Sequence, residues 1–230
     1  VARKKALNEA DIAFLCLPDS AAIEAVSLID NPNTVVLDTS TAHRTNDSFA
    51  YGFPELSANH FEKIKNSKRI AVPGCHASGF ISLVYPLIEA GLLETDALIS
   101  CHSITGYSGG GKKMITEYQS EERSVLLGAP GQYALSQTHK HLKEMKGICG
   151  LENAPIFSPI VSDFYSGMAV TVPLFASQVK GSVAELKKLY AEKYHGEIVK
   201  YVESADENGF LSGAALSGKD SMCITVAGND

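Results

Sequence analysis

Short apolar runs alternate with a helical stretch at the start of the chain. Residues 11–17, DIAFLCL, form an apolar run that stops at Pro18, and residues 34–40, TVVLDTS, form a second. Between them, the alanine-rich residues 20–29 predict a helix. Apolar strands without polar alternation, separated by a helix, are typical of a parallel sheet covered on both faces. Because ligands bind at the carboxyl ends of such strands, residues 18–20 and 38–41 are predicted to face a ligand.

A second helix follows the strand-like residues 70–72. It is predicted to run through Glu89, with Ser78 and Gly79 opening it and Pro86 limiting its regular run. Cys75 falls in the tight Pro-Gly turn that joins the strand to this helix.

Strands predominate in the rest of the chain. A strand at 97–105, ALISCHSIT, leads into the Gly-rich loop 106–113, GYSGGGKK, and then into a polar and helical region. Strands within 155–177 and 221–228 flank a helix at 183–194, for which Ser182 is the expected cap and Gly196 the expected end. This pattern predicts an α+β domain that packs one sheet face on helices, and no internal repeat is visible.

Composition narrows the class of protein. The chain has 230 residues, 45% of them hydrophobic, and no apolar run reaches membrane-spanning length. The net charge is −6 without a basic cluster, so nucleic acid is not an expected partner. The five cysteines are odd in number and never form a C-x-x-C pair, which argues against a disulfide framework or a zinc site. We therefore expect a cytoplasmic protein with reduced thiols and no metal.

Cys75 is the strongest candidate for chemistry. The amide groups and dipole at a helix N-terminus stabilise a thiolate, which is the nucleophilic form of the side chain. The alternative is a buried cysteine that acts as a small hydrophobic residue.

Six ordered segments resemble the N-acetyl-γ-glutamyl-phosphate reductase family, in its shorter form. They are CLPDSAA at 16–22, DTSTAHRT at 38–45, YGFPEL at 51–56, VPGCHASG at 72–79, TGYSGGGKK at 105–113 and HKHLKE at 139–144. The resemblance implies an α/β fold: a partial doubly wound, Rossmann-like NADP-binding domain over 1–74 and an α+β catalytic and oligomerisation domain with a mixed sheet over 75–230. It also implies an N-terminal strand with a Gly-rich turn before Val1 and a further segment after Asp230, so we expect a fragment.

The resemblance also implies a reaction. An acyl phosphate is reduced with NADP(H) to a semialdehyde in arginine biosynthesis, through a thioester on Cys75. His141 is implied as the base that holds the thiol proton, in preference to His139, and Glu144 as a residue that could orient it. Without the resemblance, an exposed helical histidine beside an i,i+4 pair of Lys140 and Glu144 is an equally good interpretation.

Ligand-binding residues are assigned more loosely. Arg44 is expected to bind a phosphate or substrate anion through its guanidinium, and an ordinary surface arginine is the alternative. Residues around Ser40 could equally cap the turn after their strand, and the Gly-rich loop could be a flexible linker. The expected cofactor contacts are Pro18, Ser40, Gly106, Ser108 and Gly109, and the expected substrate contacts are Arg44, Ser78 and Lys112.

Three other functions remain open from the sequence. An aspartate-semialdehyde dehydrogenase-like reductase shares the chemistry but not the segments YGFPEL and HKHLKE. A cysteine hydrolase or acyltransferase could use Cys75 and His141 without nicotinamide. The chain could also be an interaction module without activity. The favoured prediction remains a reductase that acts on a small molecule, without a membrane or nucleic-acid partner, as a homo-oligomer.

Overall fold

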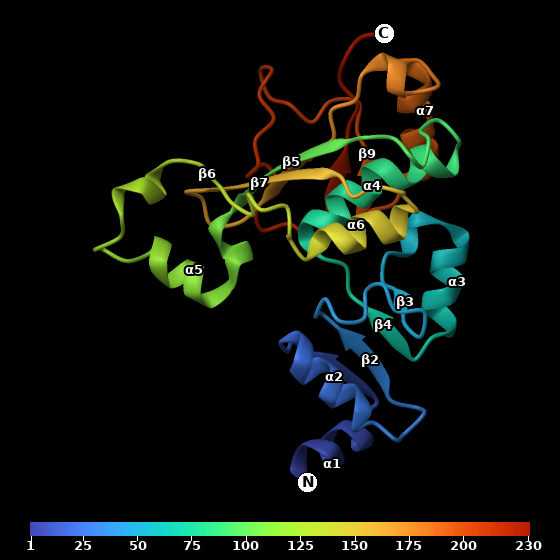
Figure 1. Ribbon diagram of the computed structural model, residues 1–230, viewed down its shortest axis with the longest axis vertical. Coiled ribbons are helices and arrows are strands. Elements are labelled where there is room, and N and C mark those ends of the chain that lie inside the picture. Colours follow the sequence, from blue (N-terminus) through green and yellow to red (C-terminus); the bar gives the residue numbers. More distant parts are fainter. The chain divides into compact units, whose positions relative to one another are not determined.

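A computed structural model describes residues 1–230, which divide into two compact units, Val1–Ser78 and Gly79–Asp230 (Figure 1). The division falls within helix α4 (Cys75–Glu89). None of the helices combines the length and the apolar character that crossing a membrane requires.

The first unit is a four-stranded parallel sheet with its connecting helices. The strand order is β1-β2-β4-β3, and every neighbouring pair is parallel, as the apolar runs predicted for the first two strands. The elements before α4 are α1 (Ala2–Glu9), β1 (Ile12–Leu15), α2 (Asp19–Ser27), β2 (Val35–Asp38), β3 (Ala50–Tyr51), η1 (Pro54–Leu56), α3 (Ala58–Asn66) and β4 (Arg69–Ala71).

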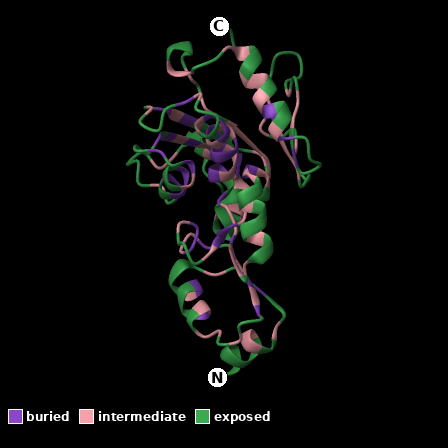
Figure 2. Cartoon of the chain, turned by 90° about the vertical axis from the view of Figure 1, so that its right-hand side faces the viewer, coloured by how far each residue is buried: buried purple, intermediate pink, exposed green.

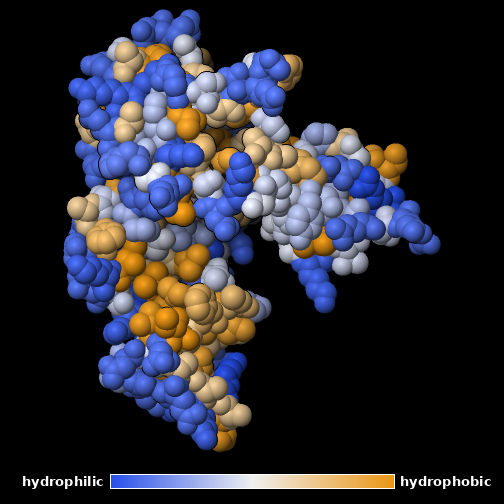
Figure 3. Space-filling view, turned by 180° about the vertical axis from the view of Figure 1, so that it is seen from behind, coloured by the Kyte–Doolittle hydropathy of each residue, from blue (hydrophilic) through white to orange (hydrophobic).

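One face of this sheet is less covered than the sequence predicted. Leu15 and Val36 are buried with Ala25 of α2, which forms the core of the unit. On β1, however, Ile12 and Phe14 remain 53% and 68% exposed. Hydrophobic side chains accordingly gather on the surface of the first unit in Figure 3. Within residues 1–230, nothing fully covers these two side chains of β1.

Helix α4 begins earlier than predicted. Its first residue is Cys75, so Ser78 and Gly79 lie inside the helix and do not open it. The carbonyl of Gly74 accepts hydrogen bonds from the Ser78 amide (2.7 Å) and the Ser78 hydroxyl (2.9 Å), which closes the first turn around the cysteine. Gly79 is needed for packing, because a Cβ atom there would lie 2.5 Å from Cγ2 of Val170.

Pro86 does not end α4, which continues to Glu89. Proline has no amide hydrogen, so the carbonyl four residues earlier, that of Ser82, loses its helical donor. The buried hydroxyl of Tyr194 donates to this carbonyl at 2.9 Å, and that of Tyr190 donates to the carbonyl of Leu83. Side chains beyond α4 thus supply the missing hydrogen bond, which sequence periodicity could not indicate.

The second unit contains a mixed four-stranded sheet and a separate parallel pair. In the order β6-β7-β5-β8, β5 pairs parallel with β7 and antiparallel with β8, and β6 pairs antiparallel with β7. The elements are β5 (Ser100–Gly106), η2 (Tyr107–Gly110), α5 (Gly111–Tyr118), η3 (Val125–Gly128), β6 (Gly131–Gln132), α6 (His141–Cys149), β7 (Ile156–Ser162), β8 (Met168–Thr171), η4 (Ala176–Gln178), α7 (Val183–Lys193), β9 (Val199–Tyr201) and β10 (Met222–Ile224). Strands β9 and β10 form the separate pair.

Helix α4 supplies much of the core of this unit. Phe80, Ile81, Val84 and Leu87 are almost completely buried. Figure 2 shows the chain coloured by burial, with many of the buried residues in its upper half. Helix α7 begins at the predicted cap, since the Ser182 hydroxyl accepts the Glu185 amide.

The predicted end of α7 is wrong. Its last residue is Lys193, and Tyr194, which bonds to α4, follows as the C-cap before Gly196 is reached.

Candidate active site

Cys75 is the exposed first residue of α4, which follows directly after the turn that leaves β4. This position places the thiol beside the first amide groups of a helix, where a thiolate is stabilised. The alternative interpretation, a buried structural cysteine, is excluded by its exposure.

The other cysteines differ in environment. None of the five forms a disulfide, as predicted. Burial raises the pKa of Cys101 to about 12 and raises the pKa of Cys149 further above its usual range. These two thiols therefore stay protonated at neutral pH and are poor nucleophiles. Cys16 is exposed, which makes it the natural control for the reactivity of Cys75.

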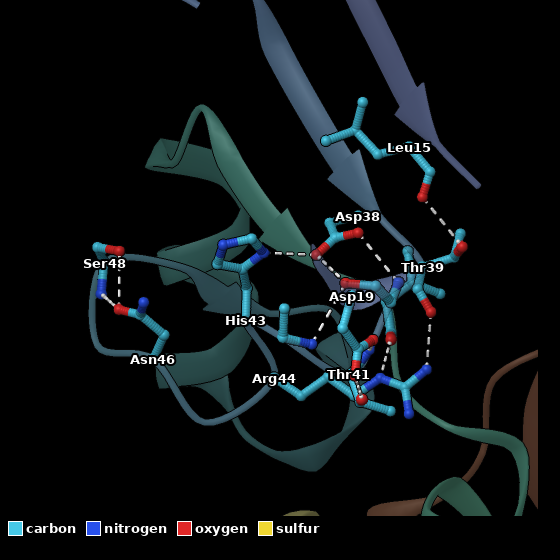
Figure 4. A network of polar contacts seen from close by, with 12 residues as sticks. Leu15, Asp19, Asp38, Thr39, Thr41, His43, Arg44, Asn46 and Ser48 are labelled. Atoms are coloured by element: carbon cyan, nitrogen blue, oxygen red, sulfur yellow. Dashed lines mark hydrogen bonds and ion pairs between the residues drawn. The ribbon is translucent and has the colours of Figure 1, made fainter. Parts of the chain in front are cut away.

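The loop after β2 is built around the buried carboxylate of Asp38. This carboxylate accepts hydrogen bonds from the Ser40 amide (3.0 Å) and the Ser40 hydroxyl (2.7 Å), and it lies 2.6 Å from Nδ1 of His43 (Figure 4). The His43 ring stacks on Phe49, with 4.2 Å between centroids. The side chain of Ser40 is thus engaged in the turn, which was one of the two roles that the sequence left open.

The loops after β1 and β2 are tied together at the carboxyl edge of the sheet. Asp19 at the start of α2 accepts hydrogen bonds from both the amide and the hydroxyl of Thr41 (Figure 4). Pro18 is the exposed N-cap residue of α2 in the same loop. This edge is where open α/β sheets bind nucleotides, so the position of both loops fits a dinucleotide.

Arg44 is buried, with 8% of its surface exposed. Its Nε donates to the carbonyl of Val72 and its Nη2 to the carbonyl of Thr39, both at 2.9 Å. The interpretation as an ordinary surface arginine is therefore wrong. These contacts join the ends of β2 and β4 inside the protein.

The Gly-rich segment is ordered by backbone contacts. The amides of Gly106, Tyr107 and Ser108 donate to carbonyls of residues 167, 164 and 165 at 3.1, 2.9 and 2.9 Å. A Cβ atom at Gly106 would lie 2.7 Å from two of these carbonyl oxygens, so only glycine permits the approach. The interpretation as a flexible linker is wrong, and these three amides are engaged within the protein. Gly109 and Lys112, near the start of α5, are exposed.

His141 is the first residue of α6 and is 5% exposed. The interpretation as an exposed helical histidine is therefore wrong, and Glu144 on the same helix is buried as well. The amide of His141 donates to Nδ1 of His139 at 3.2 Å, and the two rings meet edge to face with 4.7 Å between centroids. The N-cap residue of α6 is Lys140, whose side chain makes no capping hydrogen bond, so His139 caps the helix from one residue earlier, a role that sequence reasoning missed.

The environment of His139 makes stability depend on pH. Burial, followed by the charge of Lys140, lowers the pKa of His139 from its usual 6.5. The neutral ring is favoured in the folded protein, so the unfolded chain binds more protons just below pH 6.5, and stability is lost as the pH falls through this window. Removal of the acceptor in His139→Ala is expected to cost about 1 kcal/mol.

Urea unfolding between pH 7.5 and 5.5 measures this effect. His139→Asn keeps an acceptor but no titrating group, so its stability should change less with pH than that of the wild type. The exposed His195 provides the control, and His195→Asn should keep the wild-type profile. Identical profiles for the wild type and His139→Asn would contradict the lowered pKa of His139.

Two family models match the chain. The model "Semialdehyde dehydrogenase, NAD binding domain" matches residues 2–64, and "Semialdehyde dehydrogenase, dimerisation domain" matches residues 75–230. The second match alone covers more than half of the chain.

Curated relatives are similar over almost the entire chain. N-acetyl-gamma-glutamyl-phosphate reductase 2 of a Nostoc species is 40% identical over 242 aligned positions, covering 99% of this chain and 74% of the relative. N-acetyl-gamma-glutamyl-phosphate reductase of Brucella ovis is 42% identical over 231 positions, covering 97% of this chain and 74% of the relative.

Solved structures share the fold at low sequence identity. An aspartate semialdehyde dehydrogenase from Francisella tularensis gives a TM-score of 0.69 at 14% identity, over 96% of this chain and 73% of that one. An aspartate semialdehyde dehydrogenase with NADP from Candida albicans gives a TM-score of 0.58 at 16% identity, over 86% of this chain and 63% of that one. The α/β fold with a parallel and a mixed sheet is therefore confirmed.

Proposed function

The chain belongs to the N-acetyl-γ-glutamyl-phosphate reductase family of semialdehyde dehydrogenases, and on this premise we propose Cys75 and His141 as its catalytic residues. The reaction is the NADPH-dependent reduction of N-acetyl-γ-glutamyl phosphate to the semialdehyde in arginine biosynthesis. The observation that carries this conclusion is 40–42% identity to reductases over 97–99% of the chain.

Cys75 is proposed as the nucleophile. Its thiolate attacks the acyl carbon and a C–S bond forms. The bond between the acyl carbon and the bridging oxygen breaks, and that oxygen leaves as part of inorganic phosphate. NADPH, when bound, supplies the hydride that reduces the thioester. Collapse of the resulting thiohemiacetal releases the aldehyde and returns the thiolate of Cys75. The exposure of the thiol at the start of α4 supports this role.

His141 is proposed as the acid and base. It takes the thiol proton from Cys75, gives a proton to the oxygen that becomes negative during reduction, and takes it back when the aldehyde leaves. Its burial supports this assignment, because a catalytic imidazole needs a fixed orientation. The capping role of His139 favours His141 over its neighbour for the proton transfer.

The cofactor is proposed to bind at the carboxyl edge of the parallel sheet. Pro18 and Ser40 lie in the two loops there, and the Asp19 to Thr41 contacts hold those loops together. In the Gly-rich segment, Gly106 and Ser108 donate their amides within the protein, which leaves the exposed Gly109 as the position best suited to approach the cofactor.

The substrate is proposed to meet Lys112, whose exposed ammonium can neutralise phosphate oxygens. Ser78 is a weaker candidate for a substrate contact, because its hydroxyl already donates to the carbonyl of Gly74, just before α4. We propose residues 1–74 as the cofactor-binding part and 75–230 as the catalytic and oligomerising part, which the extents of the two family matches support. The enzyme is proposed to act in the cytoplasm as a homo-oligomer.

The reverse reaction tests the function. We expect the full-length enzyme to produce NADPH, seen by its absorbance, from N-acetylglutamate semialdehyde, phosphate and NADP. Omission of phosphate should abolish the signal, because phosphate is the group that attacks the thioester in this direction. Aspartate semialdehyde is the matched control substrate and should react far more slowly.

Two results would contradict the proposal. Preference for aspartate semialdehyde would indicate an aspartate-semialdehyde dehydrogenase. Release of the acid from an acyl phosphate or ester without any nicotinamide dependence would indicate a cysteine hydrolase.

A further inference from the structure

We propose that Arg44 is a positioning residue that fixes the turn presenting Cys75. The inference rests on the proposed role of Cys75 as nucleophile and adds a residue that acts through the backbone. It is an alternative to the untested expectation that Arg44 binds an anion.

Val72, three residues before Cys75, is held at both of its backbone polar groups. Its amide donates to the carbonyl of Asp38 at 2.8 Å, and its carbonyl accepts Nε of Arg44 at 2.9 Å. Asp38 is the last residue of β2, and Arg44 lies in the segment that follows it. The backbone three residues before the nucleophile is therefore held by this strand and that segment.

Little freedom remains between Val72 and the thiol. Pro73 has its φ angle fixed by the ring, and Gly74 is buried. The carbonyl of Gly74 is held by two hydrogen bonds from Ser78. A displacement of Val72 is therefore transmitted through this turn to Cys75.

The guanidinium of Arg44 is suited to this task by its shape. While Nε reaches Val72, Nη2 donates to the carbonyl of Thr39 at 2.9 Å, so one planar group bridges the chain at the ends of two strands (Figure 4). A lysine carries the same charge on a single nitrogen and cannot reproduce this fork. The neighbouring contact of His43 with Asp38 holds the segment from which Arg44 extends.

Arg69 offers a matched control at the other end of the same strands. Its Nη1 donates to the carbonyls of Thr34 at 2.8 Å and Lys68 at 3.2 Å, next to the amino ends of β2 and β4. It thus makes the same kind of contact in the same sheet, far along the strands from the turn of Cys75. A merely stabilising role would lower the urea midpoint in both variants and leave the alkylation rate of Cys75 unchanged in both.

The experiment compares these two variants in the full-length enzyme. We measure kcat, the KM values, the urea midpoint and the rate at which iodoacetamide alkylates Cys75, with Cys16 replaced by serine and the site read by mass spectrometry. Arg44→Lys is expected to lower kcat roughly 10- to 100-fold and to slow alkylation, with the KM for NADP unchanged. Arg69→Lys is expected to shift the urea midpoint but to keep the wild-type alkylation rate.

Three results would overturn the inference. The first is equal kcat and equal alkylation rates in the two variants. The second is a raised KM for phosphate with unchanged kcat in Arg44→Lys, which would favour the anion-binding role. The third is a wild-type alkylation rate in Arg44→Lys. Should Arg44→Lys fail to fold, Arg44→Ala with added guanidinium replaces it, and guanidinium must then restore the alkylation rate. An active Cys75→Ser variant would instead remove the proposed nucleophile, so the two failures are distinguishable.

Discussion

Cys75→Ser is expected to abolish reductase turnover while the protein remains folded. A serine hydroxyl is essentially never ionised at neutral pH, so neither attack on the acyl phosphate nor formation of a thioester can proceed at a useful rate. Loss of the nucleophile should lower kcat by a factor on the order of 10⁴ or more. Because the side chain is exposed, the urea midpoint should scarcely change.

Phosphate-dependent NADPH formation is the measurement, and Cys16→Ser is the control. Cys16 is the other exposed cysteine, and its replacement should leave kcat unchanged. Turnover of Cys75→Ser near the wild-type rate would rule out a covalent mechanism at this residue. Loss of folding in Cys75→Ser would indicate that the turn depends on the thiol itself.

His141→Asn is expected to slow turnover by about 10²-fold or more, the usual contribution of a positioned acid or base. Asparagine keeps much of the size of the ring and a hydrogen-bonding amide, but it cannot exchange a proton. The variant should also lose the limb of the kcat/KM pH profile that the imidazole produces in the wild type.

His139→Asn is the matched control for this experiment, because it alters the adjacent ring and retains an acceptor for the helix cap. It should keep most of the wild-type activity at pH 7.5. If His139→Asn lost activity while His141→Asn kept it, the proton-transfer role would belong to His139. Equal rates in the wild type and His141→Asn would remove the assignment altogether.

The first strands were predictable because their signal is local. Residues 11–17 and 34–40 contain the apolar runs of β1 and β2, and their parallel pairing follows from the helix between them. The position of Cys75 was predictable for the same reason, since the strand, the Pro-Gly turn and the helix that follows are all signalled by neighbouring residues. Ser182 was recognisable as a cap from its own sequence context.

Distant residues decide the features that local sequence does not explain. Pro86 stays within α4 because a tyrosine more than a hundred positions later, Tyr194, donates to the carbonyl that proline leaves without a donor. Whether Ile12 and Phe14 of β1 are covered depends on what packs against the sheet. The sequence of this one strand does not reveal that.

The sequence by itself determined the strand and helix order of the first unit, the cysteine at the start of a helix and the family of the enzyme. These follow from apolar runs, turn residues and ordered motifs, all of which act over short stretches of chain. Only the tertiary structure decided that Arg44 is buried against Val72 and that His139 caps the helix of His141. A side-chain donor or acceptor finds its backbone partner through folding, and for Arg44 that partner lies 28 positions away.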